Sequence, residues 1–92
     1  MGEWEINFSE ESEKFLNKNH LSNESIVDLI EKAGYKIVGE DVNIEIKKLS
    51  GKLQGFYRIK SGKLRIIFAI NFDAKNIFIE YIEWRGRAYK NK

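Results

Sequence analysis

The sequence contains no cysteine and no proline. Without cysteine, disulfide bridges, thiol chemistry and cysteine metal sites are all excluded. No apolar run reaches the roughly 18 residues that a membrane-spanning helix needs. The N-terminal stretch MGEWEINFSEE also lacks the basic and apolar regions of a signal peptide. From these absences we expect a soluble protein of the cytoplasm, without a membrane association.

The length of 92 residues predicts a single domain covering residues 1–92. Hydrophobic residues make up 42% of the chain and aromatic residues 13%, so a true core is expected rather than disorder. A domain of this size buries only roughly 60–65% of the surface that its unfolded chain exposes. Its margin of stability should therefore be small.

The net charge of +2 conceals an uneven distribution. Residues 1–46 carry four Lys or Arg against eleven Asp or Glu, a net charge of −7. Residues 47–92 carry twelve Lys or Arg against three Asp or Glu, a net charge of +9. Such asymmetry favours a polyanion-binding face on the basic half. The alternative is that ion pairs across the fold simply neutralise the two halves.

The N-terminal half predicts one strand and two helices. In EWEINFS, apolar and polar residues alternate as in a half-buried strand. Ser9 is suited to cap a short helix that ends at about Asn19. Ser22 is suited to cap a second helix, whose apolar residues recur at helical spacing from Ile26 to Ala33. This helix could end at Gly34 or continue to about Val38.

The second half predicts three strands, at about 54–60, 64–72 and 76–84, after a connector at 39–53 with some extended character. Ser61-Gly62 is a plausible two-residue hairpin turn, and a second turn is expected from Asp73 onward. The order β-α-α-β-β-β predicts a small α+β fold. In it, two helices would pack on one face of an antiparallel sheet.

The segment GFYRIKSGKLRIIF places four cations on one hairpin without an acidic residue: Arg58, Lys60, Lys63 and Arg65. If Ser61-Gly62 is the turn, residue 60 opposes 63 and residue 58 opposes 65, which gathers all four on one side. Like charges at opposed positions destabilise a sheet. A bound phosphodiester would relieve this cost, because Arg offers bidentate donors to phosphate. A solvated edge explains Lys63 well and the two arginines poorly.

The C-terminal segment EWRGRAYKNK supplies the cations Arg85, Arg87 and Lys90 and the phenol of Tyr89. An Arg for phosphate and a Tyr for base stacking often occur together in contacts with single-stranded RNA. Tyr89 could instead pack locally against the domain. Trp84 is expected in the core or at its rim.

Taken together, these residues resemble the RelE/ParE toxin superfamily of bacterial and archaeal toxin–antitoxin systems. The similarity extends over nearly the whole chain in length, element order and the three closing strands. Its most specific parts are YRIK, a turn with Gly, KLRIIF and the tail WRGRAY. The set is more similar to the RelE branch of ribosome-dependent mRNA endonucleases than to the ParE branch of gyrase poisons. The interval from Arg85 to Tyr89 is shorter than in some members.

The resemblance implies a single RelE-like toxin domain that cleaves mRNA in the ribosomal A site. It also implies a cognate antitoxin that wraps the domain with helices and either covers the basic groove or displaces the tail, and it implies no metal or other cofactor. The catalytic residues that it implies are Arg58, Lys60, Arg65, Arg85 and Tyr89. Further contacts to RNA or the ribosome are expected from Lys47, Lys48, Lys63, Arg87 and Lys90, although a solvated loop explains Lys47 and Lys48 equally well.

The expected reaction is attack of an RNA 2′-OH on the adjacent phosphate, which needs a base, charge stabilisation and an acid. Arg58 and Arg65 suit the stabilisation of the phosphorane. Lys60 is the candidate base, because neighbouring cations disfavour its charged form, an effect that bound phosphate opposes. By resemblance, Arg85 would serve the leaving oxygen and Tyr89 would stack on a base.

Two other functions remain open at the level of the sequence. A toxin that inhibits gyrase without nuclease activity would use the hairpin cations only structurally. A basic RNA-binding module without catalysis would bind RNA in a salt-sensitive way and yield no cleavage product.

Overall fold

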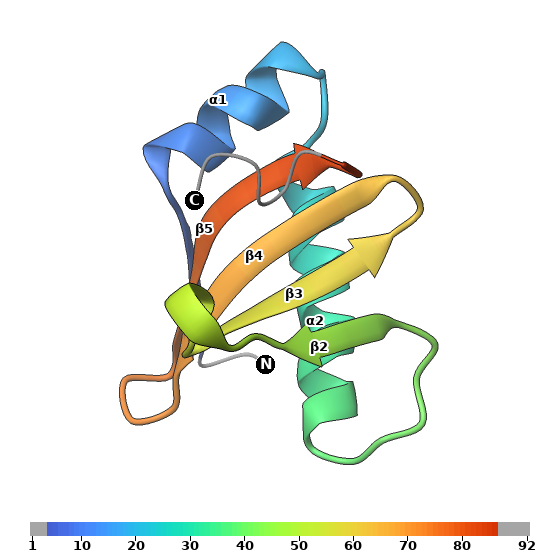
Figure 1. Cartoon of the computed structure of the whole chain (residues 1–92), viewed down its shortest axis with the longest axis vertical. Coiled ribbons are helices and arrows are strands. Elements are labelled where there is room, and N and C mark those ends of the chain that lie inside the picture. Colours follow the sequence, from blue (N-terminus) through green and yellow to red (C-terminus); the bar gives the residue numbers. More distant parts are fainter. Residues whose placement is uncertain (1–3, 87–92) are drawn as a thin grey trace.

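The computed structural model describes residues 4–86 as two layers, a five-stranded sheet and two helices that pack on one of its faces (Figure 1). The elements in chain order are β1 (Glu5–Phe8), α1 (Glu10–Lys18), α2 (Asn23–Ile37), β2 (Glu45–Lys48), a short 3₁₀ turn η1 (Gly51–Leu53), β3 (Phe56–Ser61), β4 (Leu64–Asn71) and β5 (Asn76–Trp84). Within this described part of the chain, no helix has the length and apolar character needed to cross a membrane.

The strand order across the sheet is β1-β5-β4-β3-β2. β2 to β5 pair antiparallel in sequence order, whereas β1 lies beside β5 and runs parallel to it. The predicted α+β fold, with both helices on one face, is confirmed. The sheet differs from the prediction in two ways: it is mixed, and β2 forms within the predicted connector.

Ser9 connects α1 to the end of the sheet. Its side chain accepts a hydrogen bond from the backbone N–H of Ser12 at 3.0 Å and donates one to the carbonyl of Glu80 at 2.6 Å. Ser12 is fully buried and donates from its hydroxyl to the carbonyl of Ile79 at 3.2 Å. The predicted cap is confirmed, and it also fixes the position of α1 against β5.

Replacing Ser9 with alanine is expected to lower the free energy of unfolding by about 1–2 kcal/mol, because an N-cap and a cross-element hydrogen bond are lost together. Ser22→Ala is the matched control. Ser22 caps α2 by accepting from Ser25 N–H at 3.2 Å, in an exposed position. Urea denaturation should therefore give the smaller loss for Ser22→Ala, and equal losses would contradict the second role of Ser9.

α2 supplies the middle of the core. Its predicted cap at Ser22 is confirmed, and its stripe of Ile26, Ile30 and Ala33 is buried. Of the two possible ends, the later one is observed, since the helix runs to Ile37. Gly39 follows with a φ of +98°, a conformation that glycine adopts without strain at the end of a helix.

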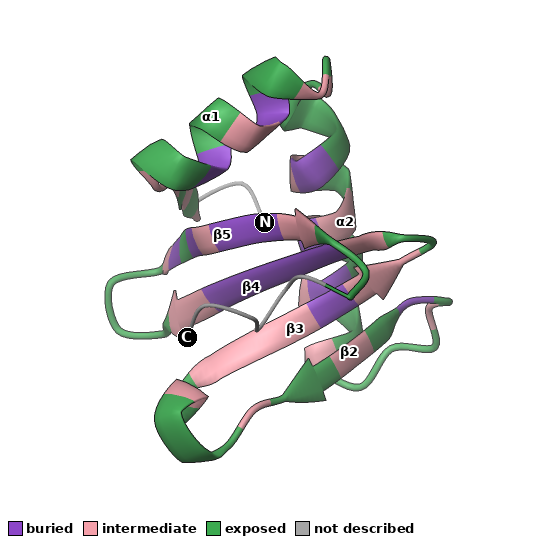
Figure 2. Ribbon diagram, turned by 45° about the horizontal axis from the view of Figure 1, so that its top comes forward, coloured by how far each residue is buried: buried purple, intermediate pink, exposed green. Residues whose placement is uncertain are grey.

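The sheet contributes the other half of this core from the face that the helices cover. Its buried residues there are Ile59, Ile66, Phe68, Ile77, Ile79 and Ile82. Burying a side chain of this size stabilises the fold by about 1.5–3 kcal/mol. In Figure 2 the buried residues concentrate in the middle strands β4 and β5, and burial decreases toward the edge strand β2.

An irregularity in β5 decides which side chains reach the other face. Ile67 pairs with Tyr81, but the next residue, Phe68, pairs with Ile79, so Glu80 is an extra residue in β5. Such a bulge reverses the alternation of side chains. Ile77 and Ile79 lie on the helix side before it, whereas Tyr81 lies on the opposite side after it. The bulged carbonyls are the ones that Ser9 and Ser12 bind.

The β3–β4 hairpin has a different register from the predicted one. Ser61 pairs with Leu64, so the two-residue turn is Gly62-Lys63 and not Ser61-Gly62. Gly62 has a φ of +58°, which explains why the turn starts at the residue without a Cβ. As a result, Lys60 pairs with Arg65. Across the same hairpin, Arg58 pairs with Ile67 and not with Arg65, so that part of the prediction is wrong.

Candidate nucleic-acid interface

The face of the sheet that neither helix covers, here called the open face, carries most of the predicted site. Alternation along the strands and the observed register assign its residues. They include Glu45 and Lys47 from β2, Phe56, Arg58 and Lys60 from β3, Arg65 and Ile67 from β4, and Phe78, Tyr81 and Glu83 from β5. Three of the predicted catalytic residues thus lie on neighbouring strands of one surface.

An apolar floor lies within the open face. Ile67 is fully buried and Tyr81 is 5% exposed, with Leu49 and Phe56 packed against them. Arg58 stands opposite Ile67, and only 18% of its side chain is exposed. Cations on such a partly desolvated surface interact more strongly with an anion than fully hydrated cations do.

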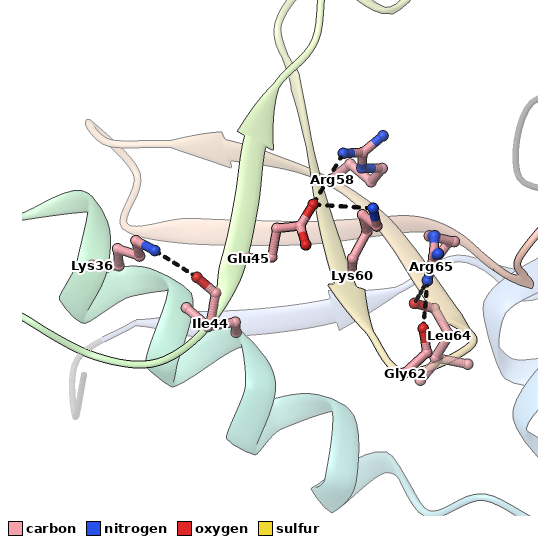
Figure 3. A network of polar contacts seen from close by, with 8 residues as sticks. All are labelled: Lys36, Ile44, Glu45, Arg58, Lys60, Gly62, Leu64 and Arg65. Atoms are coloured by element: carbon pink, nitrogen blue, oxygen red, sulfur yellow. Dashed lines mark hydrogen bonds and ion pairs between the residues drawn. The ribbon is translucent and has the colours of Figure 1, made fainter.

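Arg58 and Lys60 converge on a carboxylate from the adjacent strand (Figure 3). Oε2 of Glu45 lies 3.1 Å from Nζ of Lys60 and 3.8 Å from a terminal guanidinium nitrogen of Arg58. Glu45 pairs directly with Lys60 in the β2–β3 ladder. The hairpin cations are therefore compensated in part by a residue outside the hairpin. To this extent, the alternative in which the acidic and basic halves neutralise each other is correct.

α2 holds the start of β2 in place. Nζ of Lys36 donates a hydrogen bond to the carbonyl of Ile44 at 2.7 Å (Figure 3). Ile44 is buried, and its side chain belongs to the core. Because side chains alternate along a strand, an inward Ile44 sends the next side chain, Glu45, toward the open face.

Arg65 has a structural role beside any catalytic one. It is 7% exposed, and one of its terminal nitrogens donates to the carbonyls of Gly62 and Leu64, both at 2.9 Å. These bonds tie the side chain to the β3–β4 turn, as Figure 3 shows. Arg65 therefore presents a guanidinium in a fixed orientation beside Lys60, its partner across the ladder.

Arg85 and Lys63 meet at the end of the hairpin. The backbone N–H of Arg85 donates to the carbonyl of Lys63 at 2.6 Å, which extends the β4–β5 ladder past Trp84. Both residues are exposed. The bulge in β5 sets the alternation so that position 85 follows Tyr81 and Glu83 on the open face.

The remaining predicted contacts are spread more widely. Lys47 is exposed and pairs with Arg58. Lys48 is exposed at the end of β2 and alternates to the other side of the strand. Trp84 packs at the rim, where its ring lies 5.4 Å from that of Phe15 and its N–H reaches Asn19. The predicted residues Arg87, Tyr89 and Lys90 lie outside the described residues.

Glu45 is the residue that the sequence reasoning missed. Its segment, VNIEIKK, alternates apolar and polar positions from Val42 to Lys47, and this period of two could have indicated a strand. A strand beside β3 would have placed Glu45 next to the hairpin cations. Within residues 4–86, no group of three or more acidic or histidine side chains could hold a metal ion.

The arrangement can bind an anionic oxygen. Lys60 supplies ammonium donors, Arg58 supplies a guanidinium, and Arg65 lies directly across the ladder from Lys60. Arginine and lysine in this combination suit a phosphodiester, whose charge they can neutralise from one side. The open face is therefore a candidate site for a nucleic-acid backbone.

No protein-family model matches this sequence, and no curated protein matches it. Several solved structures do match this chain. RelE in an archaeal RelE–RelB complex from Pyrococcus horikoshii OT3 is 24% identical, with a TM-score of 0.65, over 92% of this chain and 98% of that one. A point mutant of YafQ from E. coli is 13% identical, with a TM-score of 0.65, over 94% and 98% of the chains. Staphylococcus aureus YoeB in a YoeB–YefM complex is 18% identical, with a TM-score of 0.59, over 89% and 97%.

These likenesses extend over nearly the full length of each chain, and they bear on the architecture. The resemblance to the RelE/ParE toxin superfamily is confirmed in this respect: the chain has the fold of the RelE-like toxins.

Proposed function

We propose that this protein is the toxin of a toxin–antitoxin system and a ribosome-dependent mRNA endonuclease of the cytoplasm, formed by a single domain. The observation that carries this proposal is the convergence of Arg58 and Lys60 on one anion position of the open face. Arg65 stands across the ladder from Lys60, and Arg85 lies at the end of the same hairpin. A nucleic-acid backbone is a polyanion that suits such a face, and the proposed reaction requires RNA because it uses the 2′-OH.

In the proposed reaction, the 2′-oxygen of one nucleotide attacks the phosphorus of the next phosphodiester. The bond from phosphorus to O2′ forms as the bond from phosphorus to O5′ breaks. The 2′-OH proton passes to a base, and the departing 5′-oxygen receives a proton from an acid. The products are a 2′,3′-cyclic phosphate and a 5′-OH, so no water or cofactor is consumed.

The charges on the open face fit the centre of this reaction. Arg58, Lys60 and Arg65 can stabilise the extra negative charge on the phosphorane. In the structure, Nζ of Lys60 lies 3.1 Å from a carboxylate oxygen of Glu45, the kind of contact by which a lysine stabilises negative charge. Charge stabilisation is therefore the role of Lys60 that the geometry supports more directly. For Arg85 we propose a role at the leaving 5′-oxygen, and for Tyr89 a role in stacking on a base.

Primer extension on an mRNA in a reconstituted translation reaction tests this function. We expect cuts in phase with the codons when ribosomes are present and none when they are left out. Intact mRNA in both reactions would reject the nuclease proposal for this protein. A gyrase supercoiling assay would then test the alternative of a toxin that inhibits gyrase. RNA binding without cleavage would instead identify a non-catalytic RNA-binding module.

We also propose a cognate antitoxin as partner. The Pyrococcus horikoshii and Staphylococcus aureus proteins were solved in complexes with RelB and YefM, respectively. A partner of this kind would inhibit most simply by covering the open face. Co-purification of the neighbouring gene product with this chain, and loss of cleavage on adding it, would support the partner.

A further inference from the structure

The candidate site contains an anion from the chain itself. Glu45 Oε2 is placed between the charged ends of Lys60 and Arg58, at 3.1 and 3.8 Å. These are the two cations that would first meet an RNA phosphate in the proposed function. A carboxylate oxygen and a phosphate oxygen have the same donor requirements, so both cannot occupy this position at once.

We propose that Glu45 is an intramolecular competitor for the RNA phosphate: it occupies the anion position in the free protein and lowers the affinity of the site for a nucleic-acid backbone. This inference rests on the proposed function, because it assigns a regulator to the same site. It also locates the bound phosphate oxygen, which would take the place now held by Oε2 of Glu45.

Three properties of Glu45 suit a competitor that can be displaced. Its side chain is 59% exposed, so the carboxylate can turn into water at little cost. It lies on β2, the edge strand, where no further strand within residues 4–86 blocks its outward path. The backbone before it is held by the bond from Lys36 to Ile44, so only the side chain has to move.

The contact is weak enough to yield to RNA. Exposed ion pairs contribute little, since water and salt screen them. A phosphodiester also brings charge from its neighbouring phosphates, which a single carboxylate lacks. Glu45 should therefore reduce affinity by a modest factor and select against single small anions more than against a polynucleotide.

The test measures binding apart from cleavage. A fluorescent RNA oligonucleotide with 2′-O-methyl sugars throughout, which cannot undergo 2′-OH attack, is titrated at low salt and followed by anisotropy. Glu45→Gln keeps the size of the side chain and removes its charge. Glu24→Gln removes the same charge from an exposed position on α2 and is the matched control. Lys60→Ala reports whether the oligonucleotide uses the site.

We expect Glu45→Gln to bind about three- to tenfold more tightly than the wild type, and Glu24→Gln to differ by less than about twofold. Unchanged or weaker binding by Glu45→Gln, with binding still lost in Lys60→Ala, would overturn the competitor and leave the proposed RNA site intact. Binding that ignores Lys60 would overturn both. Circular dichroism of each variant checks that the fold is retained.

Discussion

Replacing Lys60 with alanine is expected to reduce mRNA cleavage by about a hundredfold or more and to leave the protein folded. Removing one group that stabilises developing charge in an active site typically costs on the order of 10²–10³ in rate. The side chain of Lys60 is 35% exposed and its ion pair with Glu45 is solvated, so its loss should hardly change stability. Initial rates from primer extension measure the effect.

Lys32→Ala is the matched control for this variant. Lys32 is an exposed lysine on α2, in the helix layer behind the sheet. Its removal changes the net charge by the same amount and leaves the open face untouched. Cleavage by Lys32→Ala should stay within about twofold of the wild type. A Lys60→Ala protein that is folded and cleaves at the wild-type rate would remove Lys60 from the site.

Replacing Phe68 with alanine is expected to cost about 3–5 kcal/mol of stability. Phe68 is 1% exposed on β4, packs against the helices and stacks on Tyr57 with ring centroids 5.6 Å apart. A small domain has about 5–15 kcal/mol of stability in total, so the variant should be close to unfolding at room temperature. Urea denaturation followed by circular dichroism gives the value.

Phe78 is the control for this prediction, because it is also a strand phenylalanine but is 38% exposed on β5. Phe78→Ala should cost about 1 kcal/mol or less, as expected for substitutions outside the core. Equal losses for the two variants would contradict the division of the sheet into a helix-covered face and an open face.

The local elements could be predicted because their signals lie close together in the sequence. Ser9 and Ser22 cap the helices that they were expected to cap. The third closing strand has its predicted bounds, and the other two differ from theirs by at most two residues at either end. In each case the periodicity of a few neighbouring residues was enough, since strands and helices differ in period.

The register in which the strands pair could not be predicted from neighbouring residues in the same way. Gly62 fits either turn, and only the structure shows that it occupies the first position, which makes Lys60 face Arg65. The bulge at Glu80 also could not be predicted from the neighbouring sequence. The hydroxyl groups that donate hydrogen bonds to the carbonyls at the bulge belong to Ser9 and Ser12, at the other end of the chain. Both features depend on contacts between distant segments.

The electrostatics of the candidate site were predicted only in part. The convergence of Arg58 and Lys60 on one face followed from alternation along a single strand. The Glu45 carboxylate between them required knowledge that β2 lies beside β3. A hairpin viewed alone therefore looked like an unbalanced set of cations, whereas in the fold part of their charge is already paired.

A single 2′-deoxy substitution in the mRNA tests whether this protein cleaves RNA through attack by the 2′-OH. The sugar immediately 5′ of a mapped cut is changed, and the mRNA is translated in the reconstituted system with the wild-type protein. Cleavage is expected to disappear at this position and to persist at unmodified sites, since only the 2′-OH is missing. Continued cleavage at the substituted position would contradict the assignment of the open face as a site for 2′-OH attack.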